Sequence, residues 1–158
     1  MSAKKTKYSY VEWFSAEEMH EHSKKWFSEL SFIRDEQKFL KNLIQSFAIK
    51  PLNKLEFSRI NDFKKAIVEN RQRLNIIAKG IQKHMNQLEI LMDGVNQIEM
   101  EKAYRKTHKL LYQKVNNYLL DYRTVKERGF AQLASILKTE KQKIVLGNPE
   151  YKVRTVSK

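Results

Sequence analysis

Cysteine is absent from the 158-residue chain, which excludes disulfides, thiolate metal sites and cysteine nucleophiles. Glycine and proline are scarce, with four and two residues. All-β folds need frequent turns, so this scarcity argues against them. No run of about 18 apolar residues is present, and the first ten residues contain no apolar segment typical of a signal peptide. We therefore expect a cytoplasmic protein that does not span a membrane.

Motifs that carry chemistry are equally lacking. The chain has no nucleotide-binding fingerprint, no paired carboxylates in a cleft-forming context, and no Ser/His/Asp arrangement. A packed bundle of helices also offers little concave volume for a substrate. We expect a protein that is not an enzyme, uses no cofactor and has no small-molecule substrate.

Helical periodicity dominates what is present. Hydrophobic residues make up 41% of the chain and recur at alternating steps of three and four, the spacing typical of coiled-coil-like seams. Short connections between such helices force neighbours to run antiparallel. The predicted fold is all-α, an elongated up-down-up antiparallel three-helix bundle, with helices at about 15–49, 53–92 and 97–143.

Two flanking segments complete the predicted organisation. The bundle occupies 15–145, after a basic, aromatic leader over 1–14 and before a basic tail over 146–158 that we expect to be disordered. The leader's aromatic residues could fold over one end of the bundle or dock into a partner. They are Tyr8, Tyr10, Trp13 and Phe14.

Local signals define the helix ends. Ser15 and Glu18 form a capping-box pattern at the first helix, and Phe14 and Met19 are spaced for a hydrophobic staple. Pro51 disfavours helical geometry just before it and should end that helix.

Glycines inside the helices are the weak points of the pattern. We expect Gly80 to be tolerated within the second helix, at a cost of about 1 kcal/mol relative to alanine. Gly129 could produce a kink or a short break in the third helix.

Polar residues interrupt the seams at two levels. In an antiparallel hairpin, facing residue numbers sum to about 104 for the first pair of helices and about 190 for the second. Gln37 should therefore lie near Asn70, and Asn70 near Tyr118 and Tyr122. We predict a polar core layer of these four residues that fixes register and partner choice.

The second level is rich in histidine. The same register brings His22, His84 and His108 to one end of the bundle, with Glu18 one turn before His22. We expect no metal there, because the paired Glu-x-x-His motifs of di-iron bundles are incomplete and core-edge histidines explain the pattern. The alternative is a divalent metal held by Glu18, His22, His84 and His108.

Charge is strongly positive and uneven. The net charge is +13, from 31 basic and 18 acidic residues. The first helix has five basic and six acidic residues, whereas 96–143 has eleven and five. Basic residues outside the seams of the second and third helices form a candidate anion-binding face: Lys64, Lys65, Arg71, Arg73, Lys79, Lys83, Lys102, Arg105, Lys106, Lys109, Lys126 and Arg128.

Two functions remain open besides the metal-binding alternative. The first is a structural or interaction protein that binds protein partners or itself, as the long seams indicate. A dimer could form a six-helix bundle. The second is a basic module that binds nucleic acid or an anionic membrane surface.

Overall fold

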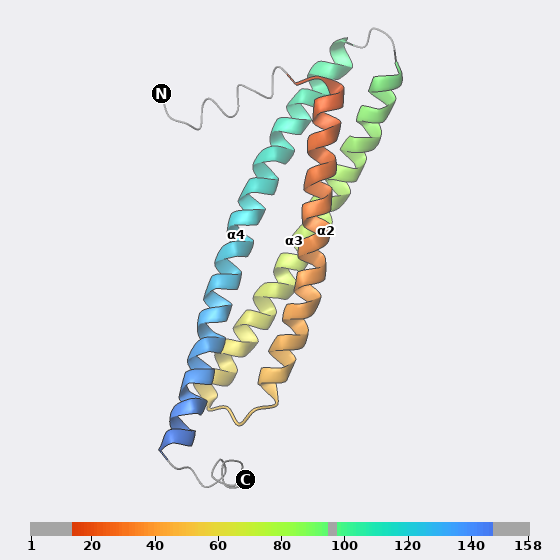
Figure 1. Cartoon of the computed structure of the whole chain (residues 1–158). Coiled ribbons are helices and arrows are strands. Elements are labelled where there is room, and N and C mark those ends of the chain that lie inside the picture. The colour runs from red at the N-terminus through yellow and green to blue at the C-terminus, as the bar shows by residue number, and fades with distance from the viewer. Residues whose placement is uncertain (1–13, 95–97, 147–158) are drawn as a thin grey trace, which may run out of the picture.

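The computed structural model describes residues 14–94 and 98–146, which form an antiparallel bundle of three long helices (Figure 1). Helix α2 covers Ala16–Ala48, α3 covers Lys54–Asp93 and α4 covers Ile98–Val145. The predicted all-α fold is confirmed, and each helix end falls within two residues of its expected place. Most of the predicted leader and tail lies outside the described residues. No helix in the described part of the chain is long and apolar enough to cross a membrane.

The start of α2 contains half of the predicted capping box. The Glu18 amide donates to the Ser15 hydroxyl over 3.2 Å, as expected. The Glu18 carboxylate accepts from the Ser15 hydroxyl at 3.3 Å instead of from the Ser15 backbone. Phe14 and Met19 pack in one apolar cluster, as the staple pattern predicts.

A complete capping box lies at the start of α3. The Glu56 amide donates to the Asn53 side-chain oxygen over 2.8 Å, and the Asn53 amide donates to the Glu56 carboxylate over 3.1 Å. These bonds satisfy amides that lack a partner within the helix. Helix α2 ends before Pro51, and the Lys50 amide donates to the Phe47 carbonyl at 3.1 Å. The α2–α3 turn is therefore defined on both sides.

The core runs along the bundle between the helices. Buried seam residues of all three helices form one large cluster, with a smaller one at the end where α2 begins. Helix α3 packs closely against both α2 and α4, whereas α2 and α4 touch each other at few points. The side between α2 and α4 is consequently the most open side of the bundle.

Gly129 lies in the middle of an uninterrupted helix, so the break considered at this position does not occur. Its backbone lies directly against the Phe63 ring, and a Cβ at this position would overlap that ring. Glycine is needed here for the close approach of α3 and α4 rather than for a bend. Gly80 differs, because an added Cβ would meet only Leu111 Cδ2, at an ordinary 3.6 Å.

Candidate functional site

Three of the four histidines gather at the end of the bundle where α2 begins. His84 comes from α3, His108 from α4 and His22 from α2. The ring centroids of His84 and His108 lie 5.2 Å apart, and those of His22 and His108 lie 5.6 Å apart. The predicted juxtaposition is confirmed for these three. His20 points elsewhere, and its Nε2 lies 3.2 Å from a Glu89 carboxylate oxygen.

Aromatic rings surround the histidines. Trp26 stacks on His108 with centroids 4.6 Å apart, and Phe14 meets the edge of His22 at 4.8 Å. The Phe14 carbonyl also accepts a hydrogen bond from Arg105 Nε at 3.0 Å. Phe14, the one described residue of the predicted leader, therefore packs over this end of the bundle.

His84 and His108 are hydrogen-bonded to each other inside the core. His84 Nε2 lies 3.0 Å from His108 Nδ1, and both side chains are fully buried. A neutral imidazole has one donor and one acceptor nitrogen. The hydrogen bond within the pair therefore uses one donor and one acceptor nitrogen, and one donor and one acceptor nitrogen are left over. These two outer atoms, His84 Nδ1 and His108 Nε2, have no partner among the described residues.

Burial keeps these histidines neutral. It lowers the pKa of His84 to about 4. Burial, with smaller contributions from His84 and His22, lowers the pKa of His108 to about 3. The pKa of His22 is also lowered, by burial first and then by the nearby Lys25. Protonation of this cluster is therefore coupled to unfolding.

The fourth candidate ligand of the metal hypothesis lies apart from the ring pair. Glu18 is exposed, and its carboxylate contacts the Ser15 hydroxyl. Within residues 14–94 and 98–146, no group of three or more His, Cys, Asp or Glu side chains is placed to hold a metal ion. The cluster has the composition of a packed aromatic and imidazole core.

The predicted polar layer lies at mid-bundle and joins all three helices. Gln37 Nε2 donates to Asn70 Oδ1 at 2.9 Å and to the Tyr118 hydroxyl oxygen at 3.2 Å. The Tyr118 hydroxyl in turn donates to Asn70 Oδ1. Burial raises the pKa of Tyr118 to about 12, so the hydroxyl remains a donor at neutral pH. Gln37 Oε1 is buried and has no partner among the described residues.

Tyr122 does not join that layer, contrary to the prediction. Its hydroxyl donates to Glu36 Oε1 at 2.6 Å, and the same oxygen accepts from Lys126 Nζ at 2.9 Å. Burial, followed by the adjacent Glu36 carboxylate, raises the pKa of Tyr122. Burial alone would raise the pKa of Glu36, but the hydrogen bonds from Tyr122 and Lys126 outweigh it and leave that pKa lowered. The three residues link α2 to α4.

A groove of about 700 Å³ lies between α2 and α4. Its apolar surface includes Phe32 on α2 and Leu120 on α4, which are 69% and 60% exposed. Sequence periodicity did not indicate this groove, because Phe32 and Leu120 lie outside the seams. The lining residues are Glu29, Phe32, Ile33, Glu36, Tyr112, Asn116, Asn117, Leu119, Leu120, Tyr122, Arg123 and Lys126.

The basic residues of the candidate anion-binding face divide between ion pairs and solvent. Arg73 pairs with Asp121 at 3.0 Å, Arg105 with Glu101 at 2.8 Å, and Lys126 with Glu36 at 2.9 Å. Lys109 also interacts with a neighbour. Lys64 and Arg71 line a pocket beside α2. The remaining members are exposed: Lys65, Lys79, Lys83, Lys102, Lys106 and Arg128.

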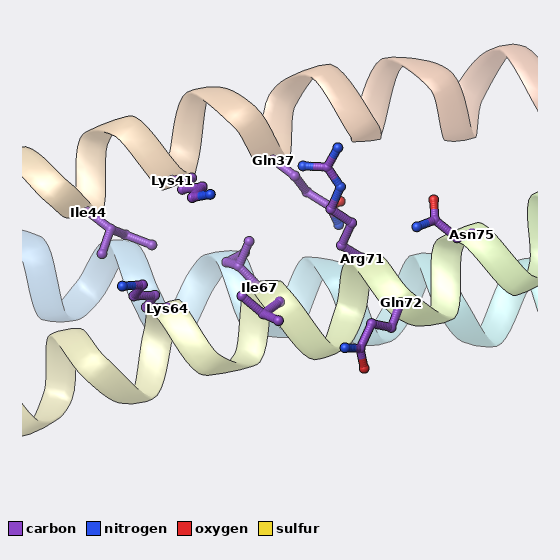
Figure 2. A pocket seen from close by; sticks show the side chains of 9 residues that line it. Gln37, Lys41, Ile44, Lys64, Ile67, Arg71, Gln72 and Asn75 are labelled. Atoms are coloured by element: carbon purple, nitrogen blue, oxygen red, sulfur yellow. The ribbon is translucent and has the colours of Figure 1, made fainter.

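The pocket beside α2 has a volume of about 260 Å³ and lies between α2 and α3 (Figure 2). Lys41, which the sequence did not single out, joins Lys64 and Arg71 there. Buried Ile44 and Ile67 form its apolar part. Figure 2 shows Lys41 and Lys64 approaching the same space from the two helices, and Arg71 reaching toward α2 beside Gln37.

Comparison with known proteins adds no further constraint, since no family model, curated protein or solved structure matches this chain.

Proposed function

We propose that this chain is a non-enzymatic interaction protein that pairs with a second copy of itself through the α2–α4 groove. The observation that carries the proposal is the 69% exposure of Phe32 on the wall of that groove. A large aromatic side chain beside a groove on the most open side of a bundle is typical of an interaction surface.

Further apolar surface continues along the same side of α2. Phe39 lies seven residues after Phe32, two helical turns along the same face, and is 62% exposed. A phenylalanine buries roughly 150–250 Å² on full burial. Phe32, Phe39 and Leu120 together would supply a substantial part of the roughly 800 Å² that each partner buries in a stable complex.

The charge of the groove lining, unlike that of the whole chain, suits a second copy better than an oppositely charged partner. The whole chain has a net charge of +13, which opposes self-association in general. The groove is an exception, because its lining contains two acidic residues, Glu29 and Glu36, and two basic residues, Arg123 and Lys126. Two copies can therefore meet here without bringing a net charge together.

The distribution of those charges suits two-fold symmetry. The acids lie on α2 and the bases on α4. A two-fold axis running along the bundle brings α2 of one copy opposite α4 of the other, as isologous packing requires. Phe32 then lies level with Leu120 of the second copy, and Glu36 lies level with Arg123, because this axis keeps each residue at its own height along the bundle. The result is a parallel six-helix assembly.

The polar groups in the core support a structural rather than a catalytic role. His84 and His108 are bonded to each other, and Gln37, Asn70 and Tyr118 are bonded to one another. None of these groups is paired with an exposed nucleophile among the described residues. Their chemistry serves packing and register.

Sedimentation equilibrium of the full chain over a wide range of concentration tests the proposal. We expect a monomer–dimer equilibrium whose Kd rises about tenfold or more in Phe32→Ser, as for a central interface residue. Ile76→Ser is the matched control, because Ile76 lies on α3 outside the groove and is 72% exposed. A strict monomer at every concentration, or equal effects of the two substitutions, would contradict the proposal.

A charge reversal tests the orientation of the two copies. Arg123 forms no ion pair with any described residue. Arg123→Glu should weaken dimerisation, because the two-fold axis sets position 123 level with Glu36 of the second copy and so brings like charges together twice. An unchanged Kd in Arg123→Glu would exclude the two-fold axis along the bundle.

A further inference from the structure

Three cationic side chains without carboxylate partners surround the pocket between α2 and α3. Lys41, Lys64 and Arg71 all line it, no acidic residue does, and none of the three forms an ion pair with a described residue. In the α2–α4 groove, by contrast, acidic residues also line the surface, and Lys126 is neutralised by Glu36. The local field of this pocket therefore favours an anion.

The interior of the pocket is apolar. Ile44 and Ile67 are buried at its base, and Val68 lines it with 46% of its surface exposed. A small inorganic anion would gain nothing from these side chains. An organic anion with a body of one or two fused rings suits a space of about 260 Å³ and gains from burial against them.

Gln37 indicates which hydrogen-bonding group the ligand carries. The side chain is 1% exposed and lines the pocket, while its Nε2 is held by Asn70 and Tyr118. Those two bonds fix the orientation of the amide and leave Oε1 as a buried acceptor without a partner among the described residues. A buried acceptor of this kind is unfavourable until a donor reaches it. The missing partner is an N–H or O–H group.

We infer that the α2–α3 pocket is a binding site for a small amphipathic organic anion that has a ring body and a hydrogen-bond donor. Arg71 and the two lysines bind the anionic group at the rim. The ring body packs on Ile44, Ile67 and Val68, and the donor bonds to Gln37 Oε1. The α2–α4 groove is a separate site, so this inference does not depend on dimerisation.

Three related probes test each part of the site by calorimetric titration into the full chain at low salt. Indole-3-acetate has a carboxylate, a bicyclic body and an N–H donor. Indole-3-acetamide lacks the charge, and naphthalene-1-acetate lacks the donor. We expect saturable one-to-one binding of indole-3-acetate, and binding about tenfold weaker for the amide, as for loss of a hydrogen bond to a charged group. The naphthalene analogue should bind severalfold more weakly.

Substitutions locate that binding on the protein. Arg71→Gln should weaken the binding of indole-3-acetate about as much as replacing its carboxylate by the amide does. Val68→Trp should abolish binding, because the larger side chain fills the pocket. Lys65→Gln is the matched control, because it makes the same charge change on α3 outside the pocket and should bind as the wild type does. Helical circular dichroism and thermal unfolding verify that each variant is folded.

Several outcomes would overturn the inference. They are the absence of saturable indole-3-acetate binding, equal binding of acid and amide, and unchanged binding in a folded Val68→Trp variant. Equal binding of the indole and naphthalene acids would overturn the role assigned to Gln37.

Discussion

His84 Nε2 and His108 Nδ1 lie 3.0 Å apart in the core, and both histidines are held neutral there. The pKa of His84 is about 4 and that of His108 about 3, against 6.5 for an ordinary histidine. Below pH 6.5 the unfolded chain therefore binds more protons than the folded one. Stability is fully present above that pH and falls as the pH drops toward 4.

Urea unfolding at pH 7.5 and pH 5 measures this effect. Each histidine costs about 1.4 kcal/mol of unfolding free energy per pH unit below pH 6.5, so between pH 6.5 and pH 5 the pair should cost roughly 4 kcal/mol in total. The double substitution His84→Leu/His108→Phe should remove most of the dependence. An unfolding free energy that is the same at both pH values would show that the pair does not control stability.

The Gln37–Asn70–Tyr118 network should behave as one unit. Asn70→Leu removes the acceptor shared by the other two side chains and should cost about 2–3 kcal/mol, because it leaves their donors buried and short of partners. Replacing all three, as Gln37→Leu/Asn70→Leu/Tyr118→Phe, should recover part of that loss. Chemical denaturation measures both. The residues would be independent if the triple variant were less stable than Asn70→Leu by the sum of the losses measured for Gln37→Leu and Tyr118→Phe alone.

The two helical glycines should respond oppositely to alanine. Gly80→Ala should stabilise the chain by about 0.5–1 kcal/mol, since the new Cβ meets only ordinary contact with Leu111. Gly129→Ala should destabilise it by about 1–3 kcal/mol, because the Cβ overlaps the Phe63 ring. Thermal unfolding compares the pair.

Adding Phe63→Leu to Gly129→Ala tests the cause. The smaller side chain makes room for the Cβ, so the double variant should lose less stability than the two single effects combined. Strict additivity would mean that the Phe63 contact is not what requires glycine at this position.

Hydrophobic periodicity and the register of each helical hairpin were enough to predict which residues share a layer of the core. Gln37, Asn70 and Tyr118 met because each occupies a seam position and the short connections fix the levels of the helices. Tyr122 lies one turn further along the same seam, where Glu36 is the nearer partner. Register arithmetic cannot separate positions one turn apart.

Features that depend on three-dimensional spacing were not predictable in this way. The sequence marked Gly129 as a weak point of its own helix. Glycine is required there because the ring of Phe63, on another helix, occupies the space that a Cβ would need. Lys41 lies on a helix with slightly negative net charge. The net charge of each helix therefore gave no sign that Lys41 lines a pocket with Lys64 and Arg71. The α2–α4 groove arises because both helices pack mainly on α3.

Thiol labelling at the groove tests whether two copies pair through the α2–α4 face. The chain has no cysteine, so Leu120→Cys and Ile76→Cys each introduce a unique thiol, one in the groove and one outside it. Maleimide labelling of position 120 should slow as protein concentration rises, while labelling of position 76 stays constant. A labelling rate at position 120 that is independent of protein concentration would show that the groove is not the pairing surface.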